Sequence, residues 1–234
     1  MKIDRDKLNK RWKNVKKNIK TSAQKARRDP NEIKLVAVSK NHPVEKIEYF
    51  KKQGIKLFGE NRVQELRKKN NMARENITWH FVGHLQRNKV KHLTRMKNCV
   101  MIESVDSLRL AEEINKRSKK NNRVMPVLVE VNISRDENKY GINPEESIEF
   151  IEQAKNDFDN LEIKGLMTIL PYVEDPEELR PYFRQMSSLK EKANNKNLDL
   201  TELSMGMTND YQIAIEEGAT IVRIGTALFG KRKY

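Results

Sequence analysis

Apolar and polar positions along the chain alternate between two patterns. Continuous apolar runs rich in β-branched residues are typical of strands that are buried on both faces. Apolar residues that recur every three or four positions are typical of amphipathic helices. The first pattern predicts eight strands, at residues 33–38, 56–58, 78–82, 99–102, 124–131, 161–168, 200–203 and 220–224. The second predicts helices between them, at residues 44–52, 62–73, 86–93, 107–119, 144–156, 176–193 and 209–217, with a short last helix near residue 225.

Regular alternation of strands and helices predicts an α/β fold with a parallel sheet covered by helices. Eight such units favour closure into a (β/α)8 TIM barrel, formed as a single domain by residues 1–234. An open, doubly wound sheet is the alternative. An extra N-terminal helix precedes the barrel, because apolar residues in the first 28 positions recur at helical spacing. These residues are Leu8, Trp12, Val15, Ile19, Ala23 and Ala26.

The net charge of +14 raises the question of a nucleic-acid partner. Residues 1–28 contain twelve Lys and Arg against two Asp, so +10 of this charge lies on the N-terminal helix. The lysines occupy the faces away from the apolar stripe, where solvation is the simpler explanation. We therefore expect no nucleic-acid partner and keep an RNA-binding module as a separate hypothesis to be tested.

Cysteine content and hydropathy bear on the cellular compartment. Cys99 is the only cysteine, so no intrachain disulfide can form, and a reducing compartment fits best. It lies in an apolar run and is expected to be a buried strand residue. No apolar run approaches the roughly 18 residues that span a bilayer, and the N-terminus does not resemble a signal peptide. These features predict a cytoplasmic protein with no membrane partner.

Barrels of this type carry their functional groups at the C-terminal ends of the strands. Lys40 follows the apolar run of the first predicted strand and should lie at the barrel mouth. Desolvation at that place favours the neutral amine, which is the form that attacks an aldehyde. By itself, Lys40 would be interpreted as a surface lysine in a lysine-rich chain.

The loops after strands seven and eight often bind phosphate in such barrels. The first of them contains Thr208, whose hydroxyl could bind an anion or cap the next helix. The second contains Gly225, which allows close backbone approach, and the hydroxyl of Thr226 at a predicted helix N-terminus. Arg223 ends the eighth strand, where an aliphatic residue is usual, and should point into the barrel mouth.

An amine opposite two phosphate-binding loops fits a phosphorylated aldehyde, of which pyridoxal 5′-phosphate (PLP) is the commonest in proteins. A sugar-phosphate aldolase, which also combines a Schiff-base lysine with a phosphate site, is an alternative at this point. An aldolase would need acid/base partners near the lysine, and the sequence places none there.

Eight short motifs occur in a fixed order through nearly the whole chain. They lie at residues 36–40, 58–65, 79–89, 131–134, 139–141, 165–168, 203–207 and 222–230. In these motifs the chain resembles the YggS/PROSC family of PLP homeostasis proteins. The resemblance implies PLP as the cofactor and a fold-type III barrel, similar to the N-terminal domain of alanine racemase.

The resemblance also implies the roles of individual residues. Lys40 would form the Schiff base with PLP, and Thr208, Gly225 and Thr226 would bind the phosphate. The family usually has serine at the position of Thr208, so the hydroxyl is kept and a methyl group is added.

Three further residues would contact the pyridine ring or support those that do. Arg223 would face the ring nitrogen, where a permanent cation disfavours a proton and weakens the ring as an electron sink. Ser204 would support Arg223 or the phosphate loop, and Asn61 would lie beside the ring. His80 and His84 have no carboxylate or cysteine at ligand spacing, so we expect no metal site.

The resemblance separates a carrier from an enzyme. Alanine racemase needs two bases, takes the second from a separate domain after the barrel, and usually has a tyrosine four residues after its lysine. This chain has Val44 at that position and ends at Tyr234, after the eighth unit. We therefore expect no catalytic residues, and a monomer that buffers PLP or delivers it to PLP-dependent apoenzymes. A weak amino-acid racemase is the alternative.

Overall fold

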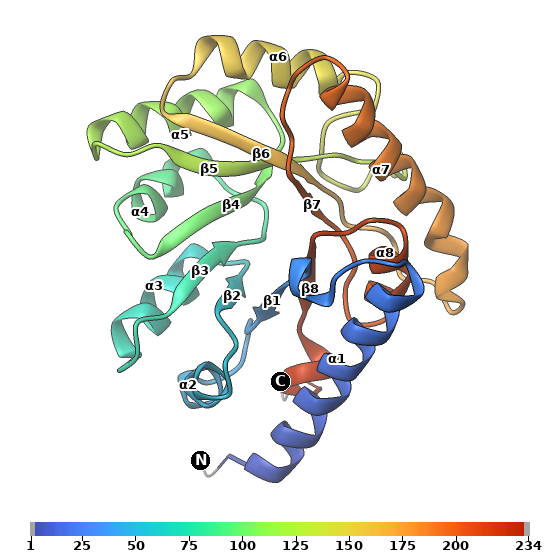
Figure 1. The fold of residues 1–234 in the computed structure, drawn as a ribbon. Coiled ribbons are helices and arrows are strands. Elements are labelled where there is room, and N and C mark those ends of the chain that lie inside the picture. The colour runs from blue at the N-terminus through green and yellow to red at the C-terminus, as the bar shows by residue number, and fades with distance from the viewer. Residues whose placement is uncertain (1–2, 232–234) are drawn as a thin grey trace.

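The computed structural model describes residues 3–231 and contains a closed barrel of parallel strands. Each strand pairs with the next along the chain, and β8 pairs with β1 (Figure 1). The strands are β1 (Lys34–Val38), β2 (Leu57–Glu60), β3 (Thr78–Phe81), β4 (Cys99–Val105), β5 (Met125–Glu130), β6 (Leu161–Met167), β7 (Glu202–Ser204) and β8 (Ile221–Ile224). The predicted (β/α)8 barrel is confirmed, and the open sheet is excluded.

Helices cover the outside of the barrel, and all the predicted helical segments are present. The α-helices are α1 (Arg5–Lys25), α2 (Val44–Lys52), α3 (Val63–Met72), α4 (Val90–Thr94), α5 (Leu108–Lys120), α6 (Ser147–Asp157), α7 (Arg180–Asn194), α8 (Tyr211–Glu216) and α9 (Thr226–Phe229). Three 3₁₀ turns are η1 (Pro30–Glu32), η2 (Arg87–Lys89) and η3 (Pro176–Leu179). The predicted helices at 86–93 and 176–193 each begin with such a turn.

The strands separate two apolar cores. The larger lies between the strands and the helices and includes Trp79, Phe58 and Phe183. The smaller fills the inside of the barrel with Val36, Val38, Val82, Met101, Leu128, Met167 and Ile221. Successive side chains of a strand point to opposite faces. A residue two positions after a member of the inner core therefore also points inward, at the end of the barrel where a site is expected.

The N-terminal helix α1 lies in the layer of helices outside the barrel. It packs against α8 and α9, which lie beside it in Figure 1. The Arg28 guanidinium donates hydrogen bonds to the carbonyls of Ile215 (2.9 Å) and Ala219 (2.8 Å), and Arg11 donates one to the carbonyl of Thr226 (3.2 Å). The helix thus supports the segments that follow strands seven and eight, while most of its lysines face solvent.

Cys99 is the buried strand residue that the sequence predicts. Cys99 is fully buried in β4, and burial raises the pKa of its thiol to about 12, so it is not a reactive thiolate. Within residues 3–231, no helix has the length and apolar character that crossing a bilayer requires.

Candidate functional site

A cavity of about 320 Å³ lies at the C-terminal ends of the barrel strands. Six of the seven predicted site residues line it, namely Lys40, Asn61, Thr208, Arg223, Gly225 and Thr226. The seventh, Ser204, is fully buried and contacts Arg223 from below the cavity. The barrel therefore brings together residues that lie up to 186 positions apart in the chain.

The loops after β7 and β8 are joined by hydrogen bonds. Thr208 Oγ1 accepts a hydrogen bond from the backbone N–H of Ala227 (3.2 Å), and the N–H of Arg223 donates to the carbonyl of Gly206 (3.0 Å). Gly206 has φ +89°, and a Cβ there would lie 2.8 Å from Cα of Tyr211, so only glycine fits this turn.

Thr208 does not cap the helix that follows it, as one interpretation of the sequence expected. Helix α8 begins at Tyr211 with Asp210 at its N-cap, and the Asp210 carboxylate accepts a hydrogen bond from the N–H of Met207. The Asp210 side chain makes no capping bond to α8 and stabilises the loop before the helix instead. The Thr208 hydroxyl is oriented instead by the loop after β8, and Thr208 lines the cavity.

Arg223 occupies the centre of the barrel end. Its side chain is almost fully buried, and it donates hydrogen bonds to Ser204 Oγ and to the carbonyl of Thr168, both at 2.6 Å. Burial lowers the pKa of the guanidinium, and the nearby carboxylates of Glu103, Glu130 and Asp210 oppose this shift. Arginine remains charged even so, because its ordinary pKa lies far above neutral pH.

Glu103 extends this buried network and was missed in the sequence. Its carboxylate accepts a hydrogen bond from Ser204 (2.6 Å) and lies 2.5 Å from Nδ1 of His80. Burial alone would raise the pKa of Glu103, but the contacts with His80, Arg223 and Ser204 outweigh burial and lower it. The sequence showed no carboxylate near His80, because the fold supplies this one from the neighbouring strand β4.

Glu130 is a second buried acid that the sequence analysis did not single out. It is 5% exposed, and its Oε2 atom has no hydrogen-bond partner among the residues that the structure describes. Burial, with a smaller effect of Asp106, raises its pKa to about 7, although Arg223 lowers it. The sequence signal that could have revealed both buried acids is a single acid in an otherwise apolar strand. Glu103 lies two positions after Met101 of the inner core, and Glu130 lies two positions after Leu128.

A cluster of charged residues lies behind Lys40. The Lys69 ammonium on α3 contacts the carboxylates of Glu60 (2.6 Å) and Glu65 (2.7 Å). Burial raises the pKa of Glu60, although Lys69 and Ser39 lower it. Burial also acts to raise the pKa of Glu65, but hydrogen bonds from Lys69 and from the N–H of Asn41 outweigh it, so that pKa is lowered.

One wall of the cavity is apolar and was also absent from the prediction. It consists of residues from the segment between β6 and α7, namely Ile169, Pro171, Tyr172, Val173, Pro176 and Leu179. Tyr172 is 78% exposed, so this wall reaches the solvent. On another side, the buried ring of His42 lines the cavity and stacks on Phe229 with a centroid distance of 5.1 Å.

His84 lies outside the cavity. Its Nδ1 atom is 3.1 Å from the Asp106 carboxylate, and its ring stacks on Tyr140 at 3.8 Å. In the part of the chain that the structure describes, no group of three or more His, Cys, Asp or Glu residues is arranged to hold a metal ion. His80 contacts the carboxylate of Glu103, and His84 contacts that of Asp106.

Comparisons with known proteins agree on one family. The model of the alanine racemase N-terminal domain matches residues 11–233. A pyridoxal phosphate homeostasis protein of Aquifex aeolicus is 47% identical over 226 residues, which cover 96% of this chain and 98% of the relative.

Solved structures give the same result. PipY of Synechococcus elongatus, determined with PLP bound, superposes with a TM-score of 0.78 at 33% identity, covering 91% of this chain and 100% of that one. Alanine racemase of Clostridium difficile has a TM-score of 0.73 at 18% identity, and the match covers 98% of this chain and 58% of the racemase. At that identity the racemase match concerns the fold alone.

Proposed function

The chain belongs to the alanine racemase N-terminal domain family, among the pyridoxal phosphate homeostasis proteins, and we propose that it binds PLP covalently through Lys40. We further propose that it buffers the cofactor in the cytoplasm, or delivers it to apoenzymes, without robust catalytic turnover. The observation that carries the proposal is that Lys40, Thr208, Gly225 and Thr226 line one cavity.

The residues of the cavity fit a phosphorylated aldehyde. Its volume of about 320 Å³ is within the usual range for small-ligand sites. Because Thr208 Oγ1 accepts the N–H of Ala227, its own hydroxyl hydrogen can be donated to a phosphate oxygen. A Cβ at Gly225 would lie 3.3 Å from the carbonyl oxygen of Val38, so glycine keeps this narrow place open.

When it is bound, PLP supplies an aldehyde that reacts with amines and a ring that can accept electrons from a carbanion. Arg223 would favour the reaction of the aldehyde with amines over the use of the ring as an electron acceptor. As a buried, permanently charged guanidinium, it would disfavour a proton on a pyridine nitrogen beside it. Ser204, Glu103 and Thr168 hold the guanidinium in place. Reversible imine exchange would remain possible, whereas carbanion chemistry would be poorly served.

Two further observations support a carrier. Val44, at the position where racemases usually have a tyrosine, is a buried aliphatic residue that begins α2 and cannot transfer a proton. The apolar wall of the cavity reaches solvent at Tyr172, which would allow the cofactor to enter and leave. We propose a monomer, with PLP-dependent apoenzymes as recipients.

The proposed lysine is tested by the visible absorption spectrum of the purified protein with PLP. The wild type is expected to show an imine band that is absent from Lys40→Ala and present in Lys68→Ala, an exposed lysine of α3. Borohydride reduction followed by peptide mass mapping should place the label on Lys40. An imine band of equal strength in Lys40→Ala would show that another lysine is used.

The carrier function is tested against the racemase alternative with L-alanine in deuterated water. We expect Cα exchange to stay close to that of free PLP, because Val44 stands at the position where racemases usually have a tyrosine. Rapid, stereospecific exchange that depends on Lys40 would instead establish an enzyme. A separate measurement of RNA binding at physiological salt tests the lysine-rich face of α1, for which we expect no specific affinity.

A further inference from the structure

Both peptide groups that flank Lys40 are held by charged side chains from one helix. The carbonyl oxygen of Ser39 belongs to the first peptide group, and it accepts a hydrogen bond of 2.6 Å from the Lys69 ammonium. The N–H of Asn41 belongs to the second, and it donates a hydrogen bond of 2.6 Å to the Glu65 carboxylate. Lys69 and Glu65 also contact each other at 2.7 Å.

This arrangement constrains the backbone of Lys40. The two flanking peptide groups set the φ and ψ angles of a residue, and these angles set the direction of its Cα–Cβ bond. Asn41 itself has φ +63°, a left-handed conformation that is uncommon outside glycine and needs local support. The hydrogen bond to Glu65 gives this support at the point where the chain turns from β1 toward α2.

The position of Lys69 is unusual for a lysine. Its side chain is 8% exposed, and the Glu60 carboxylate that it contacts is fully buried. Ser39 Oγ donates to the same carboxylate at 2.6 Å, so the residue before Lys40 is held through both its backbone and its side chain. Replacing a whole buried ion pair by apolar residues is often neutral or stabilising, and the best attested effect of such a pair is to specify one arrangement.

We propose that Lys69, with Glu65, is a positioning residue that directs the Lys40 amine toward a phosphorylated aldehyde in the cavity. This inference rests on the proposed function, because it concerns the reaction of that amine. In the reaction the amine nitrogen adds to the aldehyde carbon, two protons leave the nitrogen with the carbonyl oxygen as water, and a C=N bond replaces the C=O bond. Lys69 takes no part in these bond changes.

The test separates positioning of the amine from the general integrity of the cavity. Pyridoxine 5′-phosphate has the ring and the phosphate of PLP but an alcohol in place of the aldehyde, so it binds without forming an imine. For Lys69→Met we expect an affinity for this analogue within about twofold of the wild type. We expect imine formation with PLP, followed by absorbance, to weaken by about tenfold to a hundredfold, since a small displacement of a reacting group has effects of this size.

Three control variants complete the experiment. Lys68→Met is the matched control, because Lys68 is exposed on the same helix and should leave both measurements unchanged. Lys69→Arg keeps a buried cation with several donors and should recover part of the imine formation. Glu65→Ala removes the acceptor of the Asn41 N–H and one of the two carboxylates that contact Lys69, at a side chain that is 20% exposed. If Lys69→Met does not fold, Glu65→Ala replaces it in both measurements.

The outcomes distinguish this inference from the proposed function. Equal loss of imine formation and of analogue binding in Lys69→Met would overturn the inference, since the residue would then only maintain the cavity. Unchanged imine formation in folded Lys69→Met, or in Glu65→Ala if it takes over the test, would also overturn it. A wild-type protein that forms no imine, or forms one independently of Lys40, would refute the proposed function itself.

Discussion

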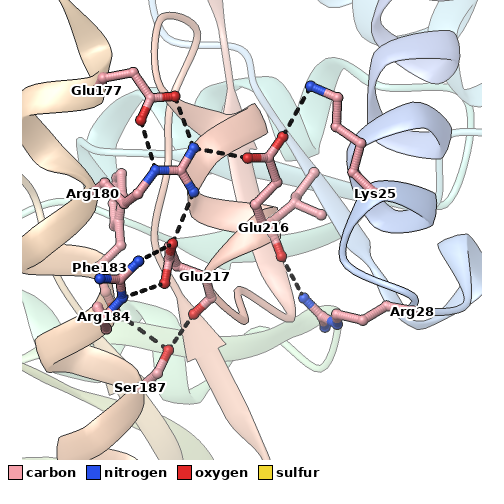
Figure 2. A network of polar contacts seen from close by, with 10 residues as sticks. Lys25, Arg28, Glu177, Arg180, Phe183, Arg184, Ser187, Glu216 and Glu217 are labelled. Atoms are coloured by element: carbon pink, nitrogen blue, oxygen red, sulfur yellow. Dashed lines mark hydrogen bonds and ion pairs between the residues drawn. The ribbon is translucent and has the colours of Figure 1, made fainter.

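Two networks of charged residues in this protein use the same chemistry in different environments. The cluster behind Lys40 joins one ammonium to two carboxylates inside the protein, with Lys69 8% and Glu60 0% exposed. The second network lies outside the barrel, where Arg180 of α7 contacts Glu177, Glu216 and Glu217 (Figure 2). Arg180 contacts three carboxylates, whereas Lys69 contacts two carboxylates and the carbonyl oxygen of Ser39. The Arg180 side chain is 25% exposed and is therefore less buried than that of Lys69.

The two networks hold different parts of the molecule together. Figure 2 shows Lys25, at the end of α1, and Arg28, just after it, reaching the end of α8 from one side, and Arg180 and Arg184 of α7 reaching it from the other. The outer network therefore links three helices around the barrel. The inner one fixes a single backbone turn beside the cavity. The comparison teaches that burial, more than the number of partners, decides whether charges specify a local conformation.

The largest effect is expected from Lys69→Met, which breaks the buried cluster. Removing one partner of a buried pair usually costs about 3–5 kcal/mol of unfolding free energy, because the other charge stays without compensation. Urea unfolding at pH 7, followed by circular dichroism, measures this change. Lys68→Met, with the same chemistry on the exposed side of α3, should change stability by less than about 0.5 kcal/mol. Equal effects of the two variants would contradict the importance assigned to burial.

Glu130→Gln sharpens the comparison, because Glu130 is a buried carboxyl that forms no ion pair within residues 3–231. Its pKa of about 7 in the folded protein lies above the ordinary value of 4.5. The folded state therefore holds the proton more tightly than the unfolded state, and stability falls as the pH rises from 4.5 to about 7. Above pH 7, Glu130→Gln should be more stable than the wild type by about 3 kcal/mol, and below pH 4.5 the two should agree.

The measurement is a series of urea unfolding curves between pH 4 and pH 8, in the range around the ordinary and shifted pKa values. Glu149→Gln, an exposed acid on α6, is the matched control and should follow the wild type throughout. If Glu130→Gln also follows the wild type across the whole range, the carboxyl is not buried in the way described.

The smallest effect is expected from Arg180→Ala, although this change removes three ion pairs at once. These pairs lie nearer the surface than the Lys69 cluster and are screened more by water and salt, so we expect the melting temperature to fall by only about 2–4 °C at low salt. At about 1 M salt, where the screening length is about 3 Å, most of the difference should disappear. Arg109→Ala, an exposed arginine of α5, serves as the control. A loss that is as large as that of Lys69→Met would refute the distinction between the networks.

Much of the fold follows from local pattern. The period of apolar residues located all eight strands, and the predicted helix at 44–52 coincides with α2. Strand β4 was predicted to end at Ile102 but continues to Val105. The charged side chain of Glu103 suggested an end to the apolar run, whereas it points into the barrel and bonds to Ser204. A local pattern cannot distinguish such a residue from one that faces solvent.

The sequence by itself determined the order of strands and helices, and the positions at strand ends where Lys40, Thr208 and Gly225 stand. This is possible because hydrophobic period and turn residues act over a few neighbouring positions. Only the tertiary structure decided which charges are buried together: Lys69 behind Lys40, and Glu103 beneath Arg223. Barrel closure brings these groups within a few ångströms across long stretches of chain, and the energy of a buried charge depends on those distances and on the exclusion of water.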